Sequence, residues 1–579
     1  MKRLNFLNHE ISNIHAAALI LGAAGFLSRL VGVLRNRLLF AEFGAGRELD
    51  IYYAAFQIPD FMAALFLLGA ASAAILPIFQ EYLLEEKKKA QEFIASLALV
   101  FFFGASLLSA AAFFAAPLAA PLVAPGFSSD EQALMVSVTR LMLISPILFG
   151  LSGIFSVVVQ SFGLFFVYAL APILYNVGII VGIAFLVPVF GIYGVGIGVV
   201  LGALAHLGLQ FGASASRGFW PGIRPGSVWS VWSGTSNRMF AGRGIKKVLV
   251  LSFPRVLAIS FSQMTGLVLV AIGSTLAAGS VAVFAAAQDL YFVPVGIFGV
   301  SYAVAIFPRL SRAAAAKSGA EYLKELALGI RAILFWTAPS AALFLVLRAH
   351  IVRVGLGAGA FSWEDTRLTA AVLAALAVAM VAAALQTLLV RGFYALGNTW
   401  IPLAVNFFSS LFSIALAFGA ANFLGSDSEL SRAIAGLFRI GDLPRPRVLG
   451  LGIGFAGGMV VNVAALAFLL VRRAERQFGA EFPRRTGEVS KIAIAALGAA
   501  AAAYLVRASF SETLPLITFM RVLVQGTAAA AAGLGTYWGM LSLMQSEDVA
   551  ALRRSVARRL FSIGILPKSW DGDRIVTSN

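Results

Sequence analysis

Residues 93–116 read FIASLALVFFFGASLLSAAAFFAA, a run that contains no charged side chain. Because an α-helix rises about 1.5 Å per residue, roughly 20 apolar residues cross the ~30 Å hydrocarbon core of a bilayer. Inside lipid, every backbone N–H and C=O group must find its partner within the segment, and a helix meets that condition. The run therefore predicts a transmembrane helix.

Similar runs recur along the whole chain, so we expect an all-α integral membrane protein with about fourteen transmembrane helices. The predicted spans are 14–40, 51–82, 93–116, 134–160, 166–190, 192–212, 248–277, 281–307, 323–347, 368–394, 400–421, 448–471, 489–506 and 516–543. The first ten residues are polar, and the first span is long and carries Arg29 and Arg35. It therefore reads as a retained helix and not as a cleaved signal peptide.

The composition excludes an ordinary soluble domain. Hydrophobic residues make up 60% of the 579 positions, charged residues make up 12%, and the mean hydropathy is +0.89. A soluble domain is about half apolar and a quarter charged. The chain has no cysteine, which excludes disulfides, thiolate chemistry and cysteine-ligated metals. The net charge of +17 does not point to nucleic acid, because the basic residues lie in short loops between apolar runs.

The distribution of these basic residues predicts the orientation. With the N-terminus in the cytoplasm, the cytoplasmic segments hold 27 lysines and arginines and the opposite face holds nine. Cytoplasmic loops carry the excess of positive charge in membrane proteins. We therefore expect a multi-pass membrane protein with both termini in the cytoplasm.

Three short sequence matches indicate an internal repeat. Tyr53–Gln57 (YAAFQ) resembles Phe284–Gln288 (FAAAQ) at an offset of 231, and Ile75–Pro77 resembles Ile306–Pro308 at the same offset. A third match, with an offset of 230, relates two Pro-x-x-x-Asn segments that end at Asn176 and Asn406. The shift carries the second helix onto the eighth and the fifth onto the eleventh. An even number of spans per copy makes the repeats parallel, an architecture of transporters with the substrate site between the halves.

We therefore predict a transporter of two parallel six-helix repeats, with two extra C-terminal helices. The predicted parts are an N-terminal lobe (1–216), a cytoplasmic basic linker (217–247), a C-terminal lobe (248–471), helices 13 and 14 (489–544) and a basic cytoplasmic tail (545–579). The tail interleaves arginines with apolar residues, which predicts an amphipathic helix on the anionic inner leaflet.

Ionisable side chains inside the spans are the first candidates for function, because they are costly in lipid. Arg29 lies deep in the first helix, where it either lines a cavity or forms a buried ion pair. Arg35 is nearer the outer end and either contributes to the cavity or extends to the interface. Asp50 opens the second helix. It either favours the dipole at that helix's N-terminus or pairs with an arginine of the first helix.

Three further polar residues complete the candidate site. Gln57 lies on the second helix, and Gln288 and Asp289 lie at the repeat-equivalent depth of the eighth helix. Asp289 is a candidate for the cavity or for a fixed pair with an arginine. Asn176 and Asn406 are expected to form hydrogen bonds between helices.

No enzyme signature stands in a fitting context. Gly452–Gly457 (GIGFAG) has the dinucleotide-binding spacing, but it lies inside an apolar span with no preceding strand. We find no Walker A sequence, no G-x-S-x-G and no H-E-x-x-H. We therefore expect a transporter and not an enzyme, with no cofactor and no metal site. Energy would come from an ion gradient, with a coupling cation as a candidate partner, from the membrane potential or from the substrate's own gradient.

Several motifs resemble one known family. They are Ser28–Arg35 (SRLVGVLR), Phe43–Gly46 (FGAG), Asp50–Phe56 (DIYYAAF), Ile58–Pro59, Gly69–Ser72 (GAAS), Leu76–Tyr82 (LPIFQEY), Ala171–Asn176 (APILYN) and Gly392–Thr399 (GFYALGNT) with Pro402. The chain resembles the MurJ (MviN) family of lipid II flippases, in the multidrug/oligosaccharidyl-lipid/polysaccharide exporter superfamily. The similarity covers helices 1 to 11 in order.

The resemblance implies a V-shaped pair of six-helix lobes in the bacterial inner membrane. The lobes would alternate between inward-open and outward-open states in peptidoglycan biosynthesis. Cavity arginines of the family hold the pyrophosphate of the lipid-linked precursor, and Arg29, Arg35 and Asp50 match family motif positions. The partners implied are a lipid-linked oligosaccharide and membrane lipids. A basic pair in the family's second helix falls here on alanine, at 63 and 64, and an arginine of its eighth helix falls on Asp289.

The loss of these arginines makes the cavity less cationic than the family's. Alternatives that stay open are an exporter of another lipid-linked glycan, an ion-coupled small-molecule antiporter and a non-transporting membrane scaffold.

Overall fold

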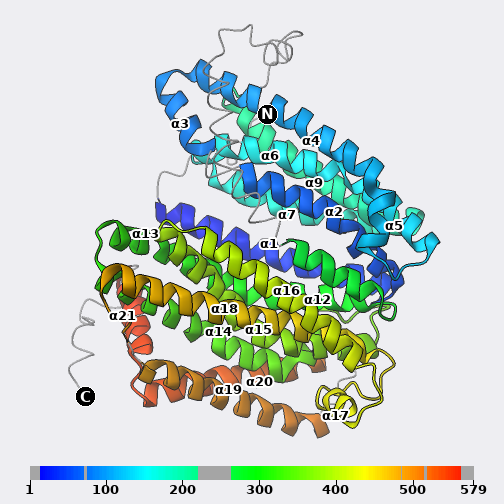
Figure 1. The fold of residues 1–579 in the computed structure, drawn as a ribbon, viewed down its shortest axis with the longest axis vertical. Coiled ribbons are helices and arrows are strands. Elements are labelled where there is room, and N and C mark those ends of the chain that lie inside the picture. The colour runs from blue at the N-terminus through cyan, green and yellow to red at the C-terminus, as the bar shows by residue number, and fades with distance from the viewer. Residues whose placement is uncertain (1–13, 71–74, 220–262, 484–485, 514–517, 563–579) are drawn as a thin grey trace. The chain divides into compact units, whose positions relative to one another are not determined.

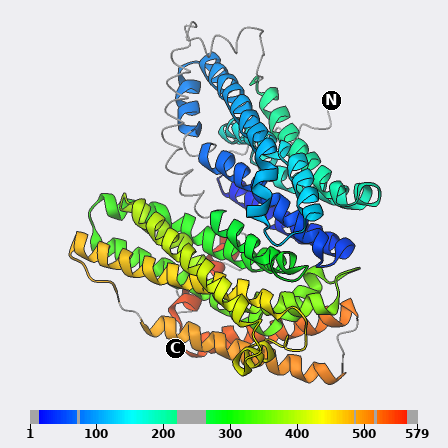
Figure 2. The same ribbon diagram turned by 45° about the vertical axis from the view of Figure 1, so that its right-hand side comes forward.

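The computed structural model describes residues 14–70, 75–219, 263–483, 486–513 and 518–562, and no strand occurs among them. The chain forms two compact units (Figures 1 and 2). Unit 1 comprises residues 1–286, 355–366 and 443–451, and unit 2 comprises residues 287–354, 367–442 and 452–579. Each unit therefore combines segments that are far apart in the sequence.

Unit 1 is built mainly from the helices α1 (Ile14–Phe43), α2 (Arg47–Ala70), α3 (Ile75–Glu85), α4 (Lys87–Val123), α5 (Ser129–Met142), α6 (Ile144–Ser161), α7 (Phe165–Val181), α8 (Val187–Phe190) and α9 (Ile192–Ser216). A short apolar helix, Gln263–Ser274, and the first turns of α12 (Ser280–Pro294) also belong to it. Helix α9 packs against both α6 and α7, α4 packs against α6, and α1 packs against α7.

Small residues let α7 and α9 approach closely. Gly178 and Gly182 face Gly198 and Gly202, and a Cβ on Gly182 would lie 2.6 Å from the Cα of Gly198. No side chain fits at that distance. The glycines, spaced by four residues, therefore form the contact seam that is typical of packed transmembrane helices.

Unit 2 contains the later helices α13 (Ser301–Ala315), α14 (Gly319–Leu356), α15 (Trp363–Ala395), α16 (Trp400–Phe423), α17 (Glu429–Leu437), α18 (Leu449–Phe478), α19 (Thr486–Thr513), α20 (Phe519–Leu543) and α21 (Glu547–Ser562), although α15 and α18 begin in unit 1. Helices α19 and α20 lie side by side. A π-helical segment, Val295–Val300, joins α12 to α13.

The predicted helical membrane fold is confirmed, but the number of fourteen spans is not. In the described part of the chain, ten helices are long and apolar enough to cross a membrane. The predicted spans 14–40 and 516–543 coincide with α1 and α20, which are not among the ten. The predicted span 51–82 corresponds to two helices, α2 and α3, and the first half of 248–277 lies outside the described residues.

The lobe boundaries remain a prediction. Most of the expected linker 217–247 falls within 220–262, which lies outside the described residues. The part of the expected tail after residue 562 also lies outside them. The tail does begin with a helix, α21, and Glu547 and Asp548 at its start pair with Arg331 of α14 at 3.0 Å each.

Candidate functional site

Asp50 is the most completely buried acid of the predicted site, with no exposed surface. Its Oδ2 accepts the backbone N–H of Gly279 at 2.6 Å, and its Oδ1 accepts that of Ala282 at 2.9 Å. Arg47 lies 3.6 Å from Oδ2. The first N–H groups of a helix have no partner within it and carry a partial positive charge. Asp50 therefore caps the N-terminus of α12, a role that neither of the two sequence hypotheses contained.

Gly279 suits this cap for two reasons. Its φ is +88°, in the left-handed region that side chains disfavour. A Cβ at this position would also collide with the carbonyl oxygen of Ala45, in the turn between α1 and α2. The turn before α12 therefore approaches the turn before α2 closely only because residue 279 has no side chain.

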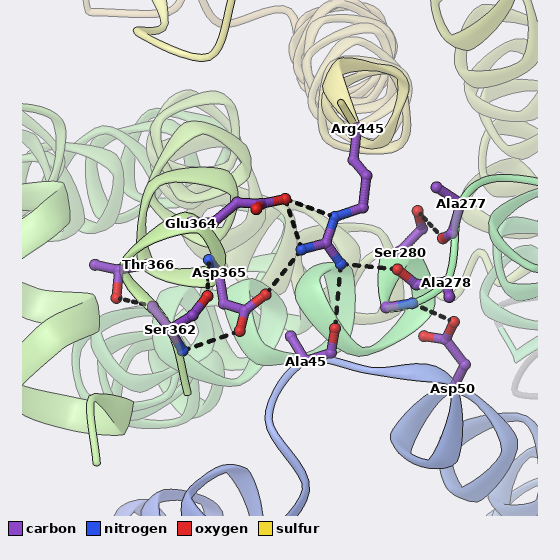
Figure 3. A network of polar contacts seen from close by, with 11 residues as sticks. Ala45, Asp50, Ala277, Ala278, Ser280, Ser362, Glu364, Asp365, Thr366 and Arg445 are labelled. Carbon is purple, nitrogen blue, oxygen red and sulfur yellow. Dashed lines mark hydrogen bonds and ion pairs between the residues drawn. The ribbon is translucent and has the colours of Figure 1, made fainter. Parts of the chain in front are cut away.

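Arg445, in the segment before α18, forms hydrogen bonds with the turns before α2 and α12 and with the start of α15 (Figure 3). Its Nε and Nη2 donate to Oε1 of Glu364 at 3.0 and 2.8 Å, and Nη2 also donates to Oδ1 of Asp365 at 3.1 Å. Its Nη1 donates to the carbonyl oxygens of Ala278 at 2.8 Å and Ala45 at 3.3 Å. A guanidinium group has five N–H donors in a fixed fork, and this one uses them to join four segments of unit 1.

The segment that carries Glu364 and Asp365 has its own hydrogen bonds at the start of α15. Ser362 and Asp365 cap the start of α15 reciprocally: the N–H of Ser362 donates to Oδ2 of Asp365, and the N–H of Asp365 donates to Oγ of Ser362, both at 3.0 Å. This arrangement is a capping box. We call Asp50, Gly279, Glu364, Asp365 and Arg445 the capping network. The Ser-x-x-Asp spacing of the capping box can be seen in the sequence, whereas the partners of Arg445 cannot.

A separate cavity of about 300 Å³ lies within unit 1. Its walls are Arg35, Phe56, Pro59, Asp60, Ala63, Ser145, Phe149, Pro172, Tyr175 and His206. These residues come from α1, α2, α6, α7 and α9. The cavity therefore lies inside the bundle of the first helices and combines one cationic, one acidic and one imidazole side chain with aromatic walls.

Arg35 is held in one orientation at the wall of this cavity. Its Nε and Nη2 donate to Oδ1 of Asn36 at 2.9 and 2.7 Å, and its Nη1 donates to Oδ1 of Asn176 at 3.1 Å. Asn176 in turn donates to the carbonyl oxygen of Pro172 at 3.1 Å. The expected helix-to-helix role of Asn176 is confirmed, because it links α7 to α1. Its repeat counterpart, Asn406, accepts from Asn462 of α18 at 2.8 Å.

Asp60 and His206 complete the polar lining. Oδ2 of Asp60 accepts from Nε2 of Gln263 at 3.2 Å. Nδ1 of His206 lies 2.6 Å from Oγ of Ser152, and its ring packs edge-on against Phe149 with centroids 5.4 Å apart. Neither residue was among the predicted site residues. A signal existed for Asp60, because it is an acid beside a proline within an apolar run.

The other predicted residues lie elsewhere. Arg29 is half-buried on α1 and does not line the cavity. Gln57 donates to the carbonyl oxygen of Tyr53 in its own helix, at 3.2 Å. Gln288 and Asp289 lie on α12 within unit 2, half-buried and exposed respectively. Arg35 thus belongs to the cavity and Asp50 to the capping network.

Comparison with known proteins identifies relatives over most of the chain. The family model described as Lipid II flippase MurJ matches residues 40–525. A lipid II flippase MurJ of Burkholderia cenocepacia is 27% identical over 398 residues, which cover 68% of this chain and 75% of that protein.

Two solved structures show the same fold. A lipid II flippase MurJ in an inward closed conformation matches with a TM-score of 0.67 and 22% identity, covering 91% of this chain and 98% of the other. An inward-facing multidrug resistance MATE transporter of the MOP superfamily matches with a TM-score of 0.61 and 13% identity, covering 78% and 95% of the two chains.

Proposed function

The chain belongs to the lipid II flippase MurJ family, and we propose that it moves lipid II from the inner to the outer leaflet of the bacterial inner membrane. It is a multi-pass protein of that membrane. The substrate is an undecaprenyl-pyrophosphate-linked peptidoglycan precursor, whose charged sugar headgroup cannot cross hydrocarbon without a large desolvation cost. A polar cavity offsets that cost while the polyprenyl tail remains in lipid.

The orientation of Arg35 in the cavity is the observation that carries this proposal. A guanidinium group matches phosphate oxygens with two parallel hydrogen bonds, and burial strengthens such charge-assisted bonds. The amide oxygens of Asn36 and Asn176 fix the guanidinium before substrate arrives, at 2.7–3.1 Å. This preorganisation lowers the entropic cost of binding. A volume of about 300 Å³ suits the pyrophosphate part of the headgroup.

Arg29, Gln57, Gln288 and Asp289 remain proposed contacts for the rest of the headgroup. Transport requires two arrangements of the helices, one open to each side, between which substrate shifts the population. With both termini in the cytoplasm, as we propose, the capping network lies at the outer ends of its helices. The hydrogen bonds that Asp50 accepts and those that Arg445 donates hold that end of unit 1 together. A coupling cation remains a candidate source of energy.

Complementation tests the proposal. The wild-type chain is expected to restore growth of a bacterium depleted of its own flippase, and to restore exposure of lipid II on the outer leaflet. Failure of the folded wild type to expose lipid II would overturn the proposed substrate.

Arg35→Lys tests the proposed contact in the same assay. Lysine keeps the positive charge but cannot form the two parallel hydrogen bonds of a guanidinium group. Exposure of lipid II should therefore fall about tenfold or more. Arg140→Lys is the matched control, because Arg140 packs over Phe113 at 4.5 Å and does not line the cavity. Full transport by a normally expressed Arg35→Lys variant would contradict the role of Arg35.

A further inference from the structure

Three arginines of unit 2 lie near enough to one another for their charges to interact, and none of them lines the proposed transport cavity. Arg348 lies on α14, Arg439 in the turn after α17, and Arg507 near the end of α19. The positive charges of Arg439 and Arg507 both act on Arg348, and that of Arg439 also acts on Arg507. Within the described part of the chain, none of these three guanidinium groups forms an ion pair with a carboxylate.

Hydrogen bonds fix Arg507 beside the turn that carries Arg348. Nη1 of Arg507 points at the carbonyl oxygen of Val346 at 3.5 Å, and the guanidinium lies 4.9 Å from the ring centroid of Tyr504. The carbonyl oxygen of Arg507 accepts from Nε2 of Gln525 at 3.0 Å. Oε1 of Gln525 in turn lies 3.0 Å from Nε2 of the buried His350. Side chains from three helices therefore set the position of Arg507.

Arg439 is placed by the turn that ends α17. Its N–H donates to the carbonyl oxygen of Gly436 at 2.9 Å, and its φ is +61°. Nε and Nη2 of Arg367 both donate to its carbonyl oxygen, and Arg367 also forks onto the carboxylate of Asp442. Asp442 thus forms an ion pair with Arg367, and Arg367 also holds the backbone of Arg439 in place.

Three positive charges close together repel one another. An anion bound between them would lower the free energy of the folded protein. A guanidinium group presents its N–H donors in a fork that matches the oxygens of a phosphate group. All three arginines also belong to the nine basic residues predicted on the outer face, where positive charge is otherwise sparse.

Each of these elements also exposes a leucine two or three residues before its arginine. Leu345, Leu437 and Leu505 are 44%, 76% and 64% exposed. An anion that carries acyl chains would cover these leucines while its phosphate meets the arginines. We propose that Arg348, Arg439 and Arg507 bind the phosphate headgroup of an anionic membrane phospholipid. This lipid would be a resident of the outer leaflet and distinct from the transported precursor.

Native mass spectrometry of the purified full chain with phosphatidylglycerol tests this site. The wild type should retain one phosphatidylglycerol more tightly than phosphatidylcholine. Arg348→Gln and Arg507→Gln should each weaken that binding about tenfold, since each removes a charge-assisted contact. Arg432→Gln is the matched control. It removes one charge from α17 without touching the three arginines, because Arg432 points at the carbonyl oxygen of Asp427 at 3.4 Å.

Two results would overturn the proposal. The first is equal retention of phosphatidylglycerol by the wild type, Arg348→Gln and Arg507→Gln. The second is binding of inorganic pyrophosphate that depends on the three arginines while phosphatidylglycerol does not compete, because the site would then serve a free phosphate. Melting temperatures identify any variant that fails to fold. Arg348→Lys then replaces Arg348→Gln, since it keeps the charge and should weaken binding less.

Discussion

The carboxylate of Asp50 accepts a hydrogen bond of 2.6 Å from the backbone N–H of Gly279, which lies 229 residues further along the chain. Ala282 supplies a second N–H at 2.9 Å. Because Asp50 is fully buried, these groups replace the water that the carboxylate loses on folding. The acid of α2 therefore anchors the first turn of α12.

Asp50→Asn should destabilise the protein by about 2 kcal/mol or more. The amide keeps one acceptor, but its NH₂ group then faces a backbone N–H that has lost its partner, and such a group costs about 1–3 kcal/mol. Chemical unfolding in detergent measures the change. Glu48→Gln, at an exposed site two residues before Asp50, should leave the free energy of unfolding unchanged. Equal stability of Asp50→Asn and the wild type would refute the anchoring role.

Gly279→Ala should cost more stability than Gly191→Ala. Both glycines have positive φ, at +88° and +55°, so each substitution carries a backbone cost of about 1 kcal/mol or more. Only at Gly279 would the new Cβ also strike a neighbour, the carbonyl oxygen of Ala45, whereas nothing lies within 4 Å at Gly191. Unfolding free energies of the two variants provide the comparison. Similar losses for both would show that the turn before α12 has room to move.

Asp289→Arg should raise the affinity for lipid II, and Asp289→Asn should have a smaller effect in the same direction. The two changes alter the local charge by two units and one unit, which matters for an anionic headgroup in a poorly screened site. Binding of lipid II in detergent measures the series. Asp427→Arg, an exposed loop position with the same change in charge, is the control. Identical affinities across the series would place Asp289 outside the substrate path.

Single introduced cysteines should report the orientation, because the natural chain has none. Ser426→Cys, before α17, should react with an impermeant thiol reagent in intact cells. Ser490→Cys, near the start of α19, should react only after the membrane is opened. Both positions are exposed. Ser546, by contrast, is buried and donates to Glu488 at 2.9 Å, so it makes a poor probe. The reverse order of labelling would invert the topology.

The contact between Arg367 and Asp442 should give a small dependence of stability on acid. Hydrogen bonds from Arg367 hold the pKa of Asp442 below its ordinary value. A carboxyl whose pKa is lowered by folding stabilises the protein above its unfolded pKa, and this contribution disappears as the pH falls through the folded pKa. The melting-temperature difference between the wild type and Asp442→Asn should therefore be present at neutral pH, begin to shrink near about pH 4, and vanish only below the lowered pKa of Asp442. A difference that persists in strong acid would show that Asp442 acts through another contact.

The membrane fold was readable from the sequence because each apolar run meets lipid independently of the others. The run at 93–116 lies wholly within α4, and the predicted spans 323–347 and 400–421 lie within α14 and α16. Length and hydropathy suffice for such segments. The count was harder to predict, because helices such as α1 and α2 carry polar residues among the apolar ones.

The partners of the polar side chains depended on tertiary structure. Asn176 was expected to bond between helices, yet nothing local indicated that its oxygen would orient Arg35. Arg445 entered the sequence argument only as one basic residue among nine, although it joins four segments of unit 1.

Asp50 opens a helix, and the sequence therefore suggested the dipole of that helix, whereas the fold places it against the first turn of α12. The length and composition of an apolar segment are enough to predict that it forms a helix in lipid. A hydrogen bond requires two atoms within about 3 Å in a defined direction, and only the packing of distant segments brings them there.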